Sequence, residues 1–528
     1  MMFPRRPDGV EKTRRDIVIK RFIDGMKTSE RRRVFYALLG GKALGLGLLF
    51  LIIAGIPHYF GHKALADDAA APLPLYVNPI NNMWVLVTAF LVFFMQAGFM
   101  FLEAGFARTR ETVNVLLEGI VDTCLCGLLF WAWGFAFMFG AGNGFIGHQY
   151  FFLHGAPDTY GSTGVSILAF FLFQYAFADT CSTITSGAMI GRTGFVGDLV
   201  YSFFVSGFIY PIFGHWAWGP DGWLNTIHPA AFHDFAGSTV VHTIGGMVSL
   251  AGAIVLGPRI GRKFKRDGGG AMPGHDMTIA AVGGVILWFG WYGFNPGSTL
   301  SAMDAAGIGR VAANTTLAAC AGGLGAMFWM YPRNKVWDCG MTINGFLAGL
   351  VAITCPCYWV SPFGAIVLGA ISGPVCALVV DLMEYLRIDD PVGAVAVHGG
   401  AGIWGTLSLG LFATGQYGAP TPTGADNSAG AVVTGLFYGG GVNQLIGQAI
   451  GSAAIGGATL IGSLIMMYFV KITVGLRVSK EGELEGIDLH EHGGGAYPEL
   501  VGSSHGFVLP EEATGTATAR AVVPSPAT

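Results

Sequence analysis

Long apolar segments alternate with short polar ones along most of this chain. From Trp84 onward there are about eleven apolar segments, each long enough, or nearly so, to cross a membrane as a helix. They are too long and continuous for the short alternating strands of a membrane β-barrel. The pattern therefore predicts an all-α polytopic membrane protein with eleven transmembrane helices. The expected spans cover residues 83–104, 113–140, 164–189, 195–219, 237–257, 278–298, 308–331, 341–358, 361–386, 393–414 and 443–474.

Lys and Arg are distributed unevenly between the connecting segments. They occur in alternate loops and in the C-terminal tail, whereas the intervening loops contain neither residue. Loops rich in Lys and Arg stay on the cytoplasmic side of a membrane. The alternation predicts a multi-pass protein of the cytoplasmic (inner) membrane, with the first span starting outside and the C-terminus in the cytoplasm. The loops without Lys or Arg cover residues 141–163, 220–236, 299–307 and 415–442.

The ends of the chain differ from its apolar middle. Residues 1 to about 42 are rich in Arg and Lys, and a short apolar run leads to Ala64-Leu-Ala66. This order is typical of a signal peptide, so we expect residues 1–66 to be removed and the mature chain to begin near Asp67; an uncleaved signal anchor is the alternative. We expect a membrane domain over residues 80–476 and a partly disordered cytoplasmic tail over 477–528.

The composition supports a membrane protein and gives no sign of an enzyme. Charged residues make up 12% of the 528 residues, about half of the share usual in soluble domains. The 82 Gly residues favour helices that approach one another closely. The net charge of −4 gives no reason to expect nucleic acid. The chain has no phosphate-binding GxxxxGK[ST] motif and no Cys spacing typical of a metal site, and we expect no cofactor or metal.

One pattern occurs twice in the apolar region. Asp234-Phe-Ala-Gly-Ser-Thr-Val-Val-His242 and Asp390-Pro-Val-Gly-Ala-Val-Ala-Val-His398 share Asp, then Gly three residues on, then Val-His. A histidine inside a membrane is costly and marks a functional site by default. Two of them at matching positions in two halves of a chain suggest one site where two structural repeats meet. The alternative is a pair of packing histidines, each bonded to a backbone carbonyl.

The aspartates that open these segments have a different role. Asp234 lies eight residues before His242, which is about 12 Å along a helix and too far for a contact within one straight helix. We expect Asp234 to cap the start of its helix and to place a negative charge near the outer site. Asp390 is expected to be the equivalent cap on the cytoplasmic side.

These two segments closely resemble the ammonium transporter family (the Amt/Mep/Rh superfamily). Further motifs agree in order from about residue 80 to 497, although Gly191-Arg192-Thr193 stands where the family often has a Glu-Arg-Thr-like stretch. The agreeing motifs are Phe94-Met-Gln-Ala-Gly-Phe-Met-Phe-Leu-Glu-Ala-Gly105, Phe173-Gln-Tyr-Ala-Phe177, Trp291-Tyr-Gly-Phe-Asn-Pro-Gly-Ser298, Thr473-Val-Gly-Leu-Arg-Val478 and Glu485-Gly-Ile-Asp-Leu-His-Glu-His-Gly493.

The resemblance implies a fold and roles for particular residues. The fold would be two inverted repeats of five helices plus one further helix, with a pore inside each subunit of a homotrimer. Phe177, Trp218 and Ser298 match an outer ammonium recruitment site, which Asp234 supports. Phe177 and Phe294 match two stacked rings that close the pore. The matching pore residues are His242, His398 and Trp291. Trp218 and Ser298 resemble the Amt type, although Trp216 and Trp223 lie close by in the sequence.

These residue types suit the selection of ammonium. Aromatic faces attract a cation by roughly 0.5–2 kcal/mol per contact, and a Ser hydroxyl can accept an N–H bond that potassium cannot offer. Deprotonation would then let neutral ammonia enter an apolar pore, and a histidine pair could relay the proton. We expect an ammonium transporter; the alternatives are a passive gas channel for ammonia or carbon dioxide and an ammonium sensor. A PII-type regulatory protein is the expected partner of the cytoplasmic tail.

Overall fold

The computed structural model describes residues 77–161, 163–418 and 432–497. The expected signal peptide over residues 1–66, the mature start near Asp67 and the part of the tail after Tyr497 lie outside these residues. Those three statements remain predictions.

Helices form nearly all of the regular structure in the described residues. The first five spans comprise α3 (Val77–Phe93) with α4 (Met95–Phe106); η1 (Thr109–Glu111), α5 (Thr112–Leu129), η2 (Phe130–Gly134) and α6 (Phe135–Phe139); α7 (Ile167–Gly187); α8 (Phe195–Phe204), η4 (Val205–Ile209) and α9 (Tyr210–Trp218); and η6 (Ser238–Thr243) with α10 (Ile244–Leu256). The next six comprise α11 (Met277–Phe294) with η8 (Pro296–Thr299); α12 (Ala305–Asn334); α13 (Cys339–Thr354); α14 (Pro362–Leu386); η9 (Val395–Gly400) with α15 (Ala401–Phe412); and α16 (Asn443–Thr473).

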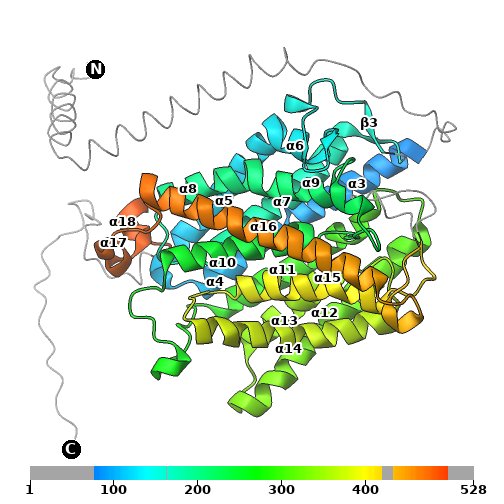
Figure 1. The fold of residues 1–528 in the computed structure, drawn as a ribbon. Coiled ribbons are helices and arrows are strands. Elements are labelled where there is room, and N and C mark those ends of the chain that lie inside the picture. The colour runs from blue at the N-terminus through cyan, green and yellow to red at the C-terminus, as the bar shows by residue number, and fades with distance from the viewer. Residues whose placement is uncertain (1–76, 162, 419–431, 498–528) are drawn as a thin grey trace, which may run out of the picture.

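The predicted spans are confirmed. Ten helices in the described residues are long and apolar enough to cross a membrane, and α13 is a shorter apolar helix of 16 residues. The two sets of five spans also share a feature of their last member, because each fifth span opens with a π-helical segment, η6 in the first set and η9 in the second. Helix α16 follows both sets and packs across α10 and α15, as Figure 1 shows.

The remaining elements are short. Two antiparallel hairpins pair β1 (Gly142–Asn143) with β2 (Ile146–Gly147) and β3 (Thr159–Tyr160) with β4 (Val165–Ser166), with Gly142 opposite Gly147 and Thr159 opposite Ser166. The 3-10 turns outside the spans are η3 (Phe151–Leu153), η5 (Trp223–Thr226), η7 (Lys265–Asp267) and η10 (Leu436–Tyr438). Two short helices, α17 (Lys480–Glu485) and α18 (Ile487–His492), form the described part of the tail.

Polar side chains fix where several spans begin. Asp276 accepts hydrogen bonds from the backbone N–H groups of Thr278 and Ile279 at the start of α11. Asp338 and Ser361 do the same for α13 and α14. These side chains satisfy donors that the first turn of a helix leaves without partners. The caps explain why apolar runs with no strong amphipathic pattern still have sharp ends.

Glycines bring the two repeats together. A Cβ at Gly283 of α11 would lie 2.3 Å from the backbone nitrogen of Leu102 on α4, and one at Gly105 would lie 2.4 Å from the backbone nitrogen of Ala280. The first span of each repeat therefore packs backbone against backbone. Such close approach of membrane helices is what small residues allow.

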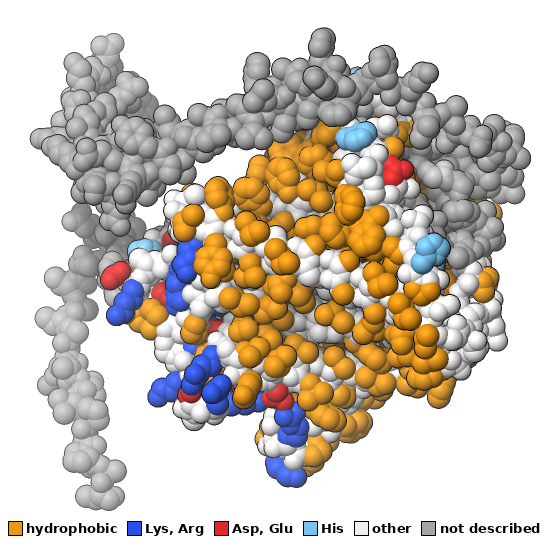
Figure 2. All heavy atoms as spheres, in the orientation of Figure 1, with side chains coloured by type: hydrophobic (Ala, Val, Ile, Leu, Met, Phe, Trp, Pro, Cys, Tyr) orange, Lys and Arg blue, Asp and Glu red, His pale blue; other side chains and the backbone are white. Residues whose placement is uncertain are grey.

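The tail folds back onto one end of the bundle, which we call the tail end. Gly475 has φ +88° and turns the chain after α16, and Figure 1 shows α17 and α18 at the end opposite the β3 hairpin. Lys and Arg side chains gather at the tail end, whereas apolar side chains cover the middle of the face seen in Figure 2. This distribution matches a membrane-embedded middle with one basic end.

Candidate functional site

Asp234 organises the start of η6. Its carboxylate accepts hydrogen bonds of 2.9–3.0 Å from the backbone N–H groups that follow it, and Gly237 between them has φ +112°. A side chain at Gly237 would be strained in this conformation and would also meet Val241. The Asp-x-x-Gly motif is therefore a compact cap with a forced turn. The four N–H groups belong to Gly237, Ser238, Thr239 and Val240.

Asp390 forms the matching cap at the tail end, where η9 begins. Its carboxylate accepts hydrogen bonds from the N–H groups of Gly393, Ala394 and Val395, and Gly393 has φ +81°. Burial raises the pKa of Asp390 to about 6, against the effect of the bonds from Val395 and Ala394. The two caps thus start their helices from opposite ends of the bundle and direct them towards its middle.

His242 and His398 meet where these helices meet. Their Nδ1 atoms are 3.2 Å apart and both rings are buried. The His242 ring also stacks on Trp291, with centroids 5.2 Å apart, and Trp291 donates its indole N–H to Thr354 at 2.9 Å. A short contact between two ring nitrogens requires one donor and one acceptor, so the two imidazoles hold complementary tautomers.

A stacked pair of phenylalanines lies beside the histidines. The ring centroids of Phe177 on α7 and Phe294 on α11 are 4.0 Å apart with an interplanar angle of 22°, and both side chains are fully buried. Phe294 also stacks on His242 at 5.3 Å. An aromatic pair therefore covers the histidine pair on one side.

Trp218 and Ser298 contact the phenylalanine pair. The Trp218 ring is 6.1 Å from Phe177, and its indole N–H donates to the carbonyl oxygen of Asp234 at 2.8 Å. The Ser298 hydroxyl donates to the carbonyl oxygen of Phe294 at 2.8 Å, which leaves its oxygen able to accept another donor. The two other tryptophans near Trp218 in the sequence pack against each other and against Phe145 instead; they are Trp216 and Trp223.

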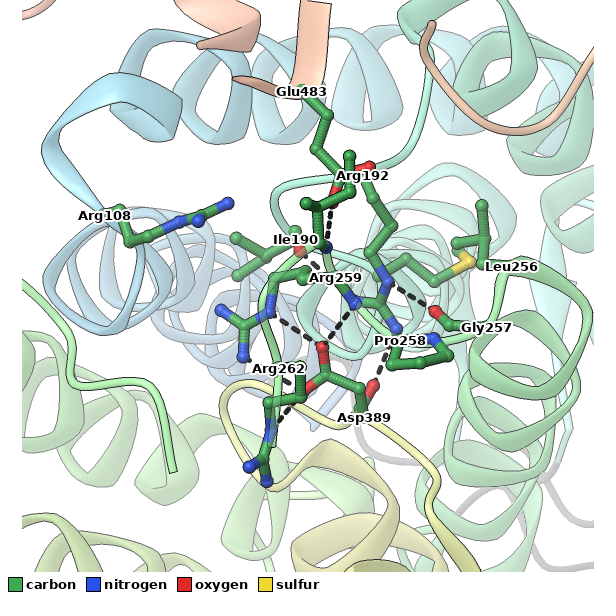
Figure 3. Close-up of polar contacts among 12 residues, drawn as sticks. Arg108, Ile190, Arg192, Leu256, Gly257, Pro258, Arg259, Arg262, Asp389 and Glu483 are labelled. Carbon is green, nitrogen blue, oxygen red and sulfur yellow. Dashed lines mark hydrogen bonds and ion pairs between the residues drawn. The ribbon is translucent and has the colours of Figure 1, made fainter. Parts of the chain in front are cut away.

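An ionic cluster lies at the tail end and joins the two repeats. The Asp389 carboxylate accepts two bonds from the Arg259 guanidinium, of 2.8 and 3.0 Å, and one from Arg262 at 3.2 Å. Arg192 donates to the carbonyl oxygens of Asp389, Ile190 and Gly257. Figure 3 shows these side chains converging on Asp389. The motif in which Gly191 departs from the family pattern thus contributes a fully buried arginine.

The buried charges of the cluster stabilise one another, because the arginines lie within hydrogen-bond distance of Asp389. Burial would raise the pKa of Asp389, but the Arg259 hydrogen bond and the positive charges of Arg192 and Arg259 outweigh it and hold the pKa well below its usual range. Burial lowers the pKa of Arg192 to about 10. Arg192 therefore remains charged at neutral pH, and the ionised Asp389 lies among the three arginines.

The tail is attached to the same end of the bundle by several bonds. Asp488 accepts hydrogen bonds from the N–H groups of Val113 and Asn114 at the start of α5. Glu483 pairs with Arg477 at 2.8 Å and accepts a bond from the N–H of Ile260. His275, in the loop before α11, lies 3.1 Å from the Tyr497 hydroxyl. The described tail thus bridges the loops of the first repeat.

Two features of the structure were not expected from the sequence. The ionic cluster combines residues from three loops, and no local spacing reveals it. Carboxyl side chains also lie buried between α4, α5, α7 and α8; these are Glu103, Glu118, Asp122, Asp179 and Asp198. The sequence contains an indication of these carboxyls, because acidic residues inside apolar segments are rare and mark functional positions.

Comparison with known proteins identifies the family. The model of the Ammonium Transporter Family matches residues 83–497. The chain belongs to this family. It is 43% identical to the Archaeoglobus fulgidus ammonium transporter Amt2 over 80% of this chain and 89% of that protein. It is 40% identical to a putative ammonium transporter, sll1017, from Synechocystis over 86% of this chain and 96% of that protein.

Solved structures agree with the family. One structure, titled "Sensor Amt Protein", is 37% identical to this chain with a TM-score of 0.70. The match covers 79% of this chain and 99% of that one. The structure of Candida albicans Mep2 is 26% identical to this chain with a TM-score of 0.67. The match covers 76% of this chain and 87% of that one. The chain is therefore a multi-pass membrane transport protein of the ammonium transporter family and not an enzyme, and it has that family's fold.

Proposed function

We propose that this protein moves ammonium across the cytoplasmic membrane by recruiting the cation, removing a proton and passing ammonia through a pore that contains two histidines. The observation that supports this most is the contact between His242 and His398, since two imidazoles from two repeats meet beside a stacked aromatic pair. The alternative of two packing histidines is weaker, because in the described residues each Nδ1 faces the other ring rather than a carbonyl.

Recruitment would use Phe177, Trp218 and Ser298. The two aromatic rings lie 6.1 Å apart and can hold a cation by its attraction to their faces. The Ser298 oxygen can accept one N–H bond, because its own proton is directed to the Phe294 carbonyl oxygen. The Asp234 carboxylate, fixed by backbone donors near Trp218, supplies a negative charge that favours a cation there.

Discrimination against potassium would follow from the deprotonation step. A cation in an apolar pore costs at least roughly 2.5–3.5 kcal/mol, whereas neutral ammonia costs much less. Phe177 and Phe294 would exclude hydrated ions, and His242, His398 and Trp291 would then line the path of ammonia. Potassium has no proton to lose and could not follow.

The orientation and partners follow from charge and family. We propose that the tail end faces the cytoplasm, because Arg108, Arg192 and Arg259 lie there. We further propose that the protein is a homotrimer with one pore in each subunit, in the lipid of the cytoplasmic membrane. The tail from α17 onward would be the docking surface for a PII-type regulatory protein.

Two other functions would use the same fold. A passive gas channel would conduct ammonia or carbon dioxide through the same pore without moving charge. A sensor would bind ammonium and signal through its tail, and one similar solved structure is titled "Sensor Amt Protein".

One experiment separates these functions. The full-length protein in proteoliposomes is studied on a solid-supported membrane with ammonium, methylammonium and potassium. Transient currents with the first two and none with potassium would support electrogenic transport. Ammonia-dependent pH changes without current would indicate a gas channel, and saturable ammonium binding without either signal would indicate a sensor.

A further inference from the structure

Five buried carboxyl groups lie among four helices of the first repeat, apart from the histidine pore. None is more than 4% exposed, and none has an ion pair among the residues that the structure describes. They are Glu103 on α4, Glu118 and Asp122 on α5, Asp179 on α7 and Asp198 on α8. We call this set the carboxyl file.

The file is built from residues that repeat along their helices. On α5, Asn114, Glu118, Asp122 and Cys126 follow one another at intervals of four residues, which puts them on one face. On α8 and η4, Asp198, Ser202 and Ser206 have the same spacing. On α7, Thr183 and Ser186 continue the line from Asp179. Three helices therefore turn polar stripes towards a common interior.

The members of the file face one another. Asp198 lies close enough to Glu118, Asp122 and Glu103 for its charge to act on all three, and Asp179 is likewise close to Asp122. Tyr201, Cys126 and Tyr175 are further titratable groups that face these carboxyls. Hydrogen bonds join further polar neighbours, from Asn114 to Glu118 at 2.8 Å, Ser186 to Glu103 at 3.0 Å, Thr183 to Gln96 at 2.9 Å and Ser206 to Ser182 at 3.2 Å.

Many polar atoms of the file lack partners. In the described part of the chain, no hydrogen bond of ordinary length and angle reaches either carboxyl oxygen of Asp122, Asp179 or Asp198, although the hydroxyls of Ser202, Thr123 and Tyr201 lie close to these carboxyls. The same holds for the hydroxyls of Tyr201 and Ser202, which face Asp198 and Asp122. Buried polar groups need partners, and buried water provides them at polar sites. The interior between these helices is therefore suited to hold a line of water.

The carboxyls are too dispersed to chelate a metal. No group of three or more His, Cys, Asp or Glu side chains among the described residues could hold a metal ion. An ionised carboxylate in a membrane interior without a cation is costly, so a proton is the simplest counterion for each. Protonated carboxyls and hydroxyls in sequence are the groups from which proton relays are made.

The file has one accessible end. Asn114, next to Glu118, bonds to the half-buried His492 of the tail at 2.8 Å, and Asp488 caps the same turn of α5. At the other end, one turn beyond Cys126, Phe130 packs against Phe171 and Tyr210. The file therefore runs from the tail end to about the level of Phe177 and stops at an aromatic layer.

Helix α7 separates the file from the pore. Phe177 and Asp179 are two residues apart, which puts them about 200° apart around the helix. One face of α7 thus carries the aromatic gate and the other carries the outer carboxyl of the file. The path of ammonia and the carboxyl file are parallel and divided by a single helix.

We propose that the carboxyl file is a hydrated proton relay between the tail end and the level of the phenylalanine pair, separate from the histidine pore. Each carboxyl accepts a proton on one oxygen and releases another from its second oxygen to the next water or carboxyl, so that charge moves and no group is consumed. The proposed function supplies the proton, released when ammonium is converted to ammonia on the Phe177 side of α7; within the proposal it enters the file at Asp179, the outermost carboxyl, and leaves at the tail end. The proposed relay depends on the proposed function only in that ammonium transport provides the proton.

The test uses the full-length protein in proteoliposomes with Asp122→Asn, Asp179→Asn and Asp198→Asn, and with Asp267→Asn as a matched control on an exposed pair at the tail end. Ammonium-evoked current and the pH of the vesicle lumen are recorded together. We expect each file variant to reduce current by about tenfold or more, equivalent to roughly 1.4 kcal/mol in the limiting step, with the control unchanged. Currents equal to wild type in all three folded variants would overturn the relay.

Infrared spectroscopy keeps the proposal testable when a variant folds poorly. The wild-type protein should show carbonyl stretches of protonated carboxyl groups that shift in D2O, because water reaches them. Absence of such bands would refute the relay. Dependence of the wild-type current on sodium or potassium, lost in the Asn variants, would overturn it in favour of a cation site. If wild type gives no current at all, the proposed transport fails, and the infrared result still decides whether the file carries protons.

Discussion

The indole N–H of Trp218 donates to the carbonyl oxygen of Asp234, whose carboxylate caps the helix that carries His242. One residue therefore fixes an aromatic ring of the proposed recruitment site and starts the helix that leads to the pore. A change at either position affects both. This coupling makes substitutions of Trp218 informative when ring and hydrogen bond are removed separately.

Trp218→Leu removes the ring, and Trp218→Phe keeps an aromatic ring but removes the indole N–H. Loss of cation–ring attraction of about 0.5–2 kcal/mol should raise the half-saturating ammonium concentration about 2- to 30-fold for Leu. The Phe variant should show a smaller increase. Trp216→Leu is the control, because Trp216 packs against Phe145 and Trp223. An equal increase in the Trp216 variant would contradict the assignment. Concentration dependence of the current gives these values.

His242→Ala and His398→Ala should abolish proton-coupled selectivity without unfolding the protein. Each substitution removes one half of the 3.2 Å contact, so the single variants and the double variant should behave alike. The measurements are ammonium and potassium currents, with thermal unfolding in detergent as the control for folding. Potassium exclusion and ammonium currents that stay unchanged in both single variants would rule out a shared site.

Phe294→Ala should open the proposed gate. The aromatic pair at 4.0 Å would lose one ring, and removal of a buried Phe side chain costs about 3–5 kcal/mol of stability. Phe294→Leu keeps most of the volume and serves as the matched variant. We expect a potassium leak from vesicles with the Ala variant and a much smaller one with Leu. An Ala variant that lets no potassium leak and still transports ammonium would show that the pair does not close the pore.

Asp389→Asn should destabilise the protein by roughly 3–5 kcal/mol at pH 7, because it leaves buried arginines without their carboxylate. The pKa of Asp389 is depressed by its arginines, so the advantage of wild type over this variant is present above the ordinary pKa of about 3.9 and is lost as the pH falls through the lower folded value. The difference in Tm should therefore stay constant from pH 8 to pH 5. A difference that vanishes between pH 7 and pH 6 would contradict this balance.

Asp390→Asn should show the opposite trend. The pKa of Asp390 is raised to about 6, so the stability linked to its protonation is present below the ordinary pKa and is lost as the pH rises through about 6. Relative to the Asn variant, wild type should gain stability on acidification from pH 7 to pH 5. The same thermal measurements test both neighbours.

Truncation after Arg477 should reduce transport, and truncation after Tyr497 should not. The shorter chain loses Asp488 and Glu483, and with them the bonds to the start of α5 and to Ile260. Loss of a helix cap costs about 0.5–2 kcal/mol, so Asp488→Asn should have a partial effect in the same direction. Initial rates of methylammonium uptake provide the comparison. Equal rates in both truncations and the full chain would exclude control by the tail.

Much of the fold could be predicted from the sequence, because membrane spans depend on apolar length. The expected span 443–474 is α16 (Asn443–Thr473), and 361–386 is α14 (Pro362–Leu386). The repeated Asp-x-x-Gly pattern also indicated two caps, because the motif is local. Local patterns do not specify partners from distant segments, and so the cluster around Asp389 was not foreseen.

The candidate site was foreseeable in part. The choice among Trp216, Trp218 and Trp223 could not be made from spacing, since it depends on how the end of α9 packs against α7. The carboxyl file was overlooked for a different reason. Each acidic residue interrupts its apolar run singly, and the set becomes visible when four helices are brought together.

Both proposed pore histidines lie in π-helical turns, His242 in η6 and His398 in η9. A π turn holds one residue more than an α turn. If the same six residues of either segment formed an ordinary α-helix instead, everything beyond the segment would be rotated by about 100°, so the histidine and its helix would no longer face inward together. The sequence between each Asp and its His can therefore vary in composition far more readily than in length. In this protein the contact between the two rings therefore depends on the number of residues that separate each capping aspartate from its histidine.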